Sequence, residues 1–173
     1  ELRDGGVPVA VLYDNSLLRR RAATTDLVTA LVERAVRRVD LITPFPYFTA
    51  DLTEALLAAV ARGVEVRLLT NGRDTALRGG PFLYAGYPTV MRLIEGGVEV
   101  WAWRANKDTI REIEATGCIP ELMPPVAIHG KMLRVDDDLS IVHSSNFNIR
   151  STYYNTEAGV VVRDAEFNRR LGE

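Results

Sequence analysis

The stretch AIHGKMLRVDDDLSIVHSSNFN, residues 127–148, has the pattern of a β-hairpin and contains both histidines of the chain. Residues two apart along a strand point to the same side, so His129 and Lys131 are predicted to share one face. On the partner strand Ser144 and Asn146 are likewise two apart, and an aspartate-rich turn joins the strands. The hairpin is therefore predicted to gather an imidazole, an ammonium, a hydroxyl and a carboxamide on one patch, a set that suits a phosphate group.

Outside the hairpin, β-rich apolar runs alternate with helical patterns. Strands are predicted at 7–13, 39–45, 64–72, 98–103 and 157–164, and helices from Thr25 to Arg38, from Thr49 or Asp51 to Gly63, over 81–95 and from Ala165 onward. This alternation is typical of an α/β domain, and the antiparallel hairpin adds to it, so a mixed β-sheet flanked by helices is expected. Residues 105–125 fit no pattern and are interpreted as an irregular insertion in a single domain that spans 1–173.

The composition narrows the class of protein. The chain has 173 residues, 47% of them hydrophobic, enough for one domain with a core. Its one cysteine, Cys118, excludes an internal disulfide and a cysteine-based zinc cluster. No apolar run approaches the roughly 20 residues that span a bilayer, and no signal peptide is visible. The net charge of −2 does not favour nucleic acid as a partner, although a local basic patch can still bind it.

The spacing His129-x-Lys131-x-x-x-x-Asp136, followed by Ser144-x-Asn146, resembles the signature of the phospholipase D superfamily. The segments PVAVLYDNS, TPFPYF, RGVEVRLLTN, GGVEVWAW and NTEAGVVV are similar to the C-terminal half of bacterial cardiolipin synthase-like enzymes. The resemblance implies a phospholipase D-like fold. One position departs from the family: His143 stands where a glycine usually precedes the serine, and it is expected to face away from Ser144.

The resemblance also implies roles. His129 would be the nucleophile that forms a phosphohistidine, or else the general acid. Lys131 and Asn146 would bind phosphoryl oxygens, and Ser144 would support that pocket. Glu157 aligns with the carboxylate that holds the other nitrogen of the catalytic histidine.

Asp136 is expected to tie the hairpin together rather than touch substrate. Neither a metal nor a cofactor is implied. Asp136 to Asp138 could instead form a calcium loop, but the spacing and glycine of an EF-hand are missing, which favours a solvated turn.

Two motifs build the active site in this superfamily, and this chain has one, so it is expected to hold half a site. The partner motif would come from an N-terminal domain of the same protein or from a homodimer.

The predicted activity is phosphatidyl transfer or hydrolysis on phospholipid at a membrane surface, in a cytoplasmic or peripheral membrane protein. A homodimeric phosphodiesterase or nuclease and a non-catalytic scaffold are the alternatives, with nucleic acid less favoured as a substrate. The chain begins at Glu1 and ends within a helical pattern, so an excised piece of a longer protein is expected.

Several other residues keep two interpretations. Arg19 to Arg21 could contact lipid headgroups or nucleic acid, or form a charged surface loop. Four aromatic residues could line a lipid entrance or pack in the core or at its rim: Tyr47, Phe48, Tyr84 and Tyr87. At least one of Trp101 and Trp103 is expected in the core, and Cys118 is expected to be inert.

Overall fold

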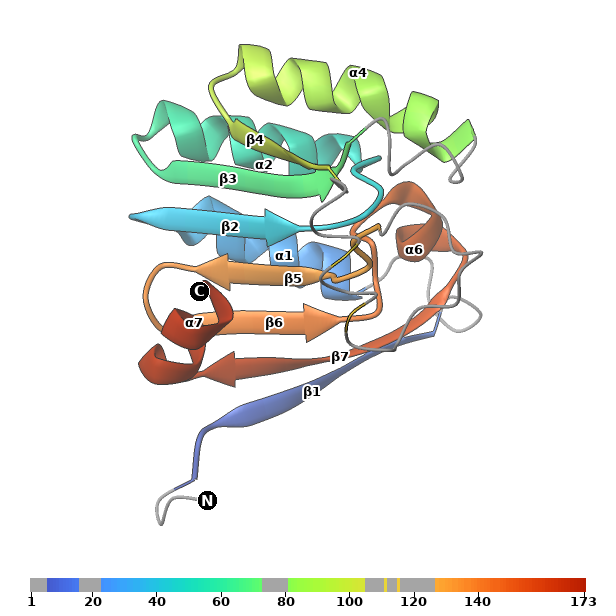
Figure 1. Cartoon of the computed structure of the whole chain (residues 1–173). Helices are drawn as coiled ribbons and strands as arrows, with labels where there is room; N and C mark the ends of the chain where they lie inside the picture. The colour runs from blue at the N-terminus through green and yellow to red at the C-terminus, as the bar shows by residue number, and fades with distance from the viewer. Residues whose placement is uncertain (1–5, 16–22, 73–80, 105–110, 112–114, 116–126) are drawn as a thin grey trace.

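The fold is built on one seven-stranded sheet, seen in a computed structural model that describes residues 6–15, 23–72, 81–104, 111, 115 and 127–173 (Figure 1). The strands are β1 (Val9–Asn15), β2 (Arg38–Ile42), β3 (Glu65–Asn71), β4 (Glu99–Trp103), β5 (Met132–Val135), β6 (Leu139–His143) and β7 (Thr156–Arg163), in the order β1-β7-β6-β5-β2-β3-β4. β2, β3 and β4 run parallel, and every other neighbouring pair is antiparallel. The predicted mixed sheet is confirmed.

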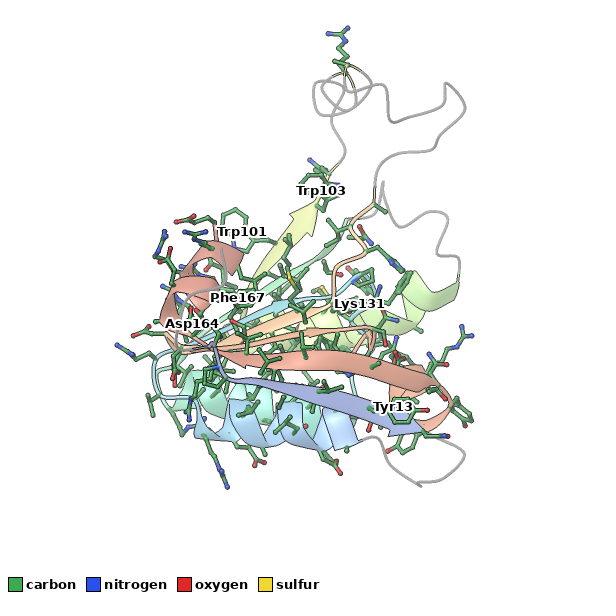
Figure 2. The ribbon with its side chains drawn as sticks, turned by 90° about the horizontal axis from the view of Figure 1, so that it is seen from below. Tyr13, Trp101, Trp103, Lys131, Asp164 and Phe167 are labelled. Carbon is green, nitrogen blue, oxygen red and sulfur yellow. The ribbon has the colours of Figure 1, made fainter. Side chains whose placement is uncertain are left out.

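Helices cover the two faces of this sheet unequally. α1 (Ala23–Arg34), α2 (Ala50–Ala61) and α4 (Pro81–Glu95) lie on one face, whereas the short α7 (Ala165–Leu171) lies on the other (Figures 1 and 2). The fully buried side chains Leu41, Leu68 and Leu133 point from three strands toward the α1 and α2 layer. Because successive side chains of a strand point to opposite faces, the residues before and after each of these leucines point to the more open α7 face.

The ends of α1 differ from the prediction. The helix begins at Ala23 rather than after Thr25, because the carboxylate of Asp14 at the end of β1 accepts the N–H of Thr24 at 3.0 Å. A long-range partner thus supplies the cap that the sequence suggested was local. The helix ends at Arg34, and Arg38 already belongs to β2.

The ends of α2 agree with the prediction. The side chain of Thr49 accepts the N–H of Leu52, and Gly63 follows the helix with φ +86°. A positive φ of this kind favours glycine at the end of a helix. The one-turn helix α6 (Ile149–Tyr153) was not predicted.

The tryptophan prediction is wrong. β4 is an edge strand of the described sheet, and Trp101 points to the α7 face with 59% of its surface exposed, while Trp103 is half-buried.

The four aromatic residues considered for a lipid entrance differ in their exposure. Phe48 is in the core, Tyr47 is half-buried and Tyr87 is exposed. The side chain of Tyr84, Arg19 to Arg21 and Cys118 lie outside the described residues, as does almost all of 105–125. In the part of the chain that the structure describes, no helix has the length and apolar character needed to cross a membrane.

Candidate phosphate site

β2 and β3 end, and β5 begins, at the same end of the sheet (Figure 1), and the polar side chains of the predicted motif belong to this end. His129 and Lys131 lie just before the start of β5, and Ser144 lies just after the end of β6, so all three are at this end of the sheet. In a sheet with parallel strands, the carboxyl ends of those strands are the usual place for a ligand. The motif residues therefore lie where the topology offers a site.

His129 and Lys131 are in direct contact. Nζ of Lys131 lies 3.0 Å from Nδ1 of His129 and donates to the backbone carbonyl of His129 at 2.7 Å. The imidazole is exposed, whereas Lys131 is only 8% exposed. Burial lowers the pKa of Lys131, an effect that Glu157 opposes, and desolvation followed by the charge of Lys131 lowers the pKa of His129. The histidine is thus held mainly in its neutral form at pH 7.

Asn71, at the end of β3, holds the backbone one residue before His129. Its Oδ1 accepts the N–H of Ile128 at 2.9 Å, and its Nδ2 donates to the carbonyl of Ile128 at 3.1 Å. The side chain therefore pairs with this peptide as a neighbouring strand would. Sequence reasoning missed the role of this residue, which it placed near the end of the predicted strand 64–72.

Ser144 and Asn146 do not continue a strand as predicted. β6 ends at His143, and residues 144–148 turn toward α6. Thr43 donates to the carbonyl of Asn146 at 3.0 Å, and the N–H of Asn146 donates to Ser151 at 3.1 Å. The backbone of Asn146 is thus fixed from two sides. The buried Oδ1 of Asn146 accepts no hydrogen bond within the described residues.

Glu157 is buried beside this turn. Its carboxylate accepts hydrogen bonds from the hydroxyl of Ser144 and, at 3.0 Å, from Nδ2 of Asn155. Among the described residues it forms no hydrogen bond with His129, whose Nδ1 faces Lys131. The contact from Glu157 to His129 therefore stays a prediction.

His143, next to exposed Ser144, is buried on the side of α1, as expected from the alternation of a strand. Its Nε2 lies 3.0 Å from the hydroxyl of Thr24.

Asp136 lies at the far end of the hairpin. Its carboxylate accepts the N–H groups of Val36, Arg37 and Arg38, which joins the hairpin turn to the segment between α1 and β2. Asp137 pairs with Arg37, and Asp138 with Arg163 at 3.1 Å. Within the described ranges, no group of three histidine, cysteine, aspartate or glutamate side chains is arranged to hold a metal.

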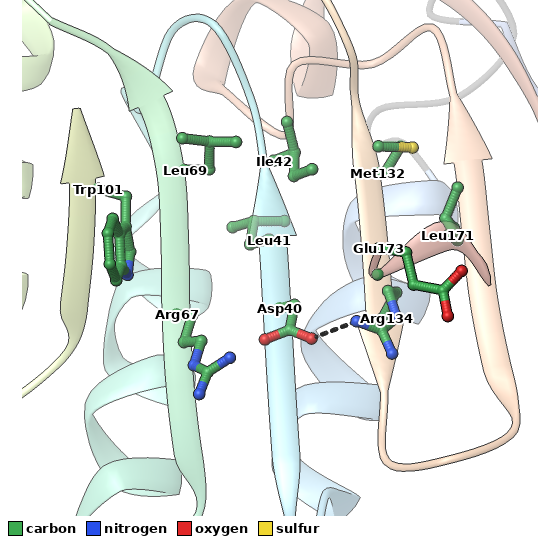
Figure 3. Close-up of a pocket in the computed structure, with 11 residues that line it drawn as sticks. Asp40, Leu41, Ile42, Arg67, Leu69, Trp101, Met132, Arg134, Leu171 and Glu173 are labelled. Atoms are coloured by element: carbon green, nitrogen blue, oxygen red, sulfur yellow. Dashed lines mark hydrogen bonds and ion pairs between the residues drawn. The ribbon is translucent and has the colours of Figure 1, made fainter. Parts of the chain in front are cut away.

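A separate hollow of about 410 Å³ opens on the α7 face of the sheet (Figure 3). Arg134 donates to Asp40 at 2.8 Å inside it, and Trp101 and Met132 line its apolar part. None of the motif residues lines this hollow, so it is distinct from the candidate phosphate site.

Known structures share this fold. Nuc from Salmonella typhimurium, a phospholipase D family member, superimposes with a TM-score of 0.68 at 18% identity, covering 96% of this chain and 90% of that one. Phosphatidylserine synthase from Haemophilus influenzae gives a TM-score of 0.68 at 17% identity over 95% of this chain and 36% of that one.

Sequence comparison identifies the family. Cardiolipin synthase A from Buchnera aphidicola is 26% identical over 145 residues, which are 84% of this chain and 25% of that protein, so the chain spans about a quarter of this relative's length. The profile described as "Cardiolipin synthase, PLD-like domain" matches residues 28–173, a range that contains the whole hairpin and its neighbours in the sheet. The chain therefore belongs to the cardiolipin synthase, PLD-like domain family.

Proposed function

We propose that this domain supplies half of an active site that transfers or hydrolyses the phosphodiester of a phospholipid through a phosphohistidine intermediate. The observation that carries the proposal is the exposed imidazole of His129 in contact with the buried amine of Lys131 at the end of the sheet. A nucleophile and a cation at this spacing suit attack on a phosphoryl group. Membership in the cardiolipin synthase family supports a phospholipid as the substrate.

The chemistry would proceed in two displacements. Nε2 of His129 attacks phosphorus, the N–P bond forms, and the P–O bond to the first alcohol breaks as a second histidine protonates the departing oxygen. A second alcohol or water then gives its proton to that histidine and attacks phosphorus, which breaks the N–P bond. Lys131 and the Asn146 carboxamide would bind the phosphoryl oxygens, and Ser144 would support the pocket.

The contact between Lys131 and His129 must change during this reaction. A nucleophilic Nε2 needs the ring proton on Nδ1, and an imidazolium acid also carries a proton there. Nδ1 now faces the ammonium of Lys131, which cannot accept that proton. Lys131 would therefore leave Nδ1 to contact a phosphoryl oxygen, and a carboxylate such as Glu157 would take over Nδ1.

The second histidine would come from outside this chain. The sequence has two histidines, and both ring nitrogens of His143 are engaged in a buried setting. An N-terminal domain of the same protein is the preferred source, because the cardiolipin synthase relative is about four times as long as the matched segment. Phospholipid as substrate would place the protein at a membrane surface.

A homodimeric phosphodiesterase is the second candidate. The observation in its favour is the coverage of 90% of Nuc, which indicates that a phospholipase D family member can be about as small as this chain. Two copies would then each contribute one His129.

The test compares phosphatidylglycerol vesicles with single-stranded DNA as substrates for the complete protein. His129→Ala is expected to abolish turnover, and Arg169→Ala, at an exposed position on α7, is the control. Histidine-bound phosphate, trapped by alkaline quenching and located by mass spectrometry, should be found on His129 or on its partner histidine. Unchanged turnover of His129→Ala would refute the catalytic assignment, and cleavage of DNA alone would favour the second candidate.

A further inference from the structure

His143 makes two directed contacts in a buried setting. The N–H of Ser145 donates to its Nδ1 at 2.8 Å, and its Nε2 lies 3.0 Å from Oγ1 of Thr24 at the start of α1. The ring is 6% exposed. A backbone N–H can only donate, so Nδ1 is the acceptor and the neutral ring carries its proton on Nε2, where it donates to Thr24. Only the neutral ring with its proton on Nε2 therefore satisfies both contacts.

The turn that this contact holds is the one between the predicted phosphate ligands. Ser145 stands between Ser144 and Asn146, and its hydroxyl accepts the N–H of Phe147 at 3.0 Å. Phe147 is fully buried and has φ +55°, a left-handed conformation that is unfavourable for a bulky residue. The turn is therefore strained and depends on its hydrogen bonds to keep this shape.

The opposite strand leaves room for the imidazole. Gly159 on β7 pairs with His143, and a Cβ at Gly159 would lie 2.1 Å from Cδ2 of the ring. The glycine usual in the family before the serine has no acceptor to offer to Ser145. In this chain the glycine is Gly159 on the neighbouring strand β7. The imidazole of His143 fills the space that this glycine leaves and accepts the hydrogen bond from Ser145.

We propose that His143 is a positioning residue of the phosphate pocket: its neutral imidazole holds the N–H of Ser145, and protonation of Nδ1 releases the turn that carries Ser144 and Asn146. The proposal rests on the proposed function, since it takes these two residues as ligands of the phosphoryl group. It predicts that this protein loses affinity for a tetrahedral oxyanion as His143 becomes charged.

Burial and the neighbouring charges shift the pKa of His143 in opposite directions. Desolvation lowers the pKa of His143, while Glu157 on β7 and Asp14 on β1 oppose that shift. Lys131 lies directly across the hairpin, where its carbonyl accepts the N–H of His143, and α1 contributes the uncharged hydroxyl of Thr24. Because burial prevails, the ring is neutral at pH 7 and the turn is held there.

The experiment measures binding of inorganic sulfate, a dianion that does not titrate between about pH 5.5 and about pH 7.5, by NMR titration of the chain. His143→Asn places an amide oxygen near the position of Nδ1, so it can accept the N–H of Ser145 but cannot titrate. His143→Leu keeps the buried volume and removes the acceptor. Because His129 titrates in all three proteins, the difference between wild type and His143→Asn isolates the contribution of His143.

At pH 7.5, His143→Asn is expected to bind sulfate within about threefold of wild type, and His143→Leu about tenfold more weakly, the loss expected for one buried hydrogen bond. On acidification, wild type should lose affinity relative to His143→Asn. The amide resonance of Ser145 should shift with the titration of the His143 ring in wild type. Should His143→Leu fail to fold, the relative pH profiles and this amide resonance still decide the matter.

Two results would overturn the proposal. Equal affinity and an equal pH profile for wild type and His143→Asn, with a Ser145 amide that ignores the titration, would refute the positioning role alone. The absence of sulfate binding in every form would refute the phosphate site itself, and with it the positioning role.

Discussion

Asp136→Ala is expected to destabilise the fold without touching the phosphate site. One oxygen of Asp136, Oδ1, accepts the N–H of Arg37 at 2.8 Å, of Arg38 at 3.1 Å and of Val36 at 3.2 Å. These donors are about 100 residues away in sequence, so the carboxylate ties the hairpin turn to the backbone that leads from α1 into β2. Asp136 also has φ +50°, a left-handed conformation that aspartate and asparagine tolerate better than alanine.

The size of the effect follows from these contacts. Three partly exposed hydrogen bonds contribute about 1 kcal/mol each, and alanine at positive φ costs about 1 kcal/mol more, which gives about 4 kcal/mol for Asp136→Ala. Asp136→Gly should lose about 3 kcal/mol because it avoids the backbone strain. Asp136→Asn keeps an oxygen at the position of Oδ1 and should lose about 1 kcal/mol.

Urea unfolding followed by circular dichroism measures these differences as shifts in midpoint at constant slope. All three variants should bind sulfate as wild type does under conditions where they are folded, because Asp136 lies at the opposite end of the hairpin from His129. Equal destabilisation by alanine and asparagine would refute the reasoning from hydrogen bonds. A loss of sulfate binding by folded Asp136→Asn would refute the structural role.

Three further changes test the motif end of the sheet. Asn71→Leu removes both hydrogen bonds from this side chain to the backbone of Ile128 and should lower the turnover of the complete protein at least tenfold, measured on phosphatidylglycerol vesicles. Unchanged turnover of Asn71→Leu would contradict the role of these hydrogen bonds in placing His129. Gly159→Ala places a Cβ against the ring of His143, so the midpoint of urea unfolding should fall by the equivalent of about 2 kcal/mol, and a silent substitution would contradict the packing. Glu157→Gln removes a buried negative charge, so the chain should bind sulfate about threefold more tightly while turnover falls, and weaker sulfate binding would contradict the electrostatic argument.

The sequence predicted the strands and most helices well because their signals are local. The run from Glu65 to Asn71 alternates, α4 keeps its predicted bounds 81–95, and Thr49 and Gly63 mark α2 by their own chemistry. The contact of His129 with Lys131 was also predicted from the two-residue spacing, although both residues precede β5 rather than lie in a strand.

The misses share a physical cause, which is dependence on contacts far apart in the chain. Asp14 on β1 accepts an N–H of the first turn of α1, and Asp136 in the hairpin accepts the N–H groups that follow α1, so both contacts come from outside the helix. Asn71 carries no mark in the sequence that distinguishes a clamp from a turn residue. The exposure of Trp101 could not be predicted because a strand pattern does not say which strand lies at the edge.

The charges at the motif end indicate why a complete two-motif site would bind a phosphodiester more tightly than this half of it. Four buried ionisable side chains lie there in the described part of the chain, namely the cation Lys131, the anions Asp14 and Glu157, and the neutral His143. Their sum is one negative charge, which repels a phosphodiester that also carries one. Each of these anions has a fixed task, since Asp14 caps α1 and Glu157 holds Ser144, so neither can be given up to improve binding. Under the proposed function, the second motif would add positive charge as a second lysine and a protonated histidine, and substrate would bind more tightly where both motifs meet.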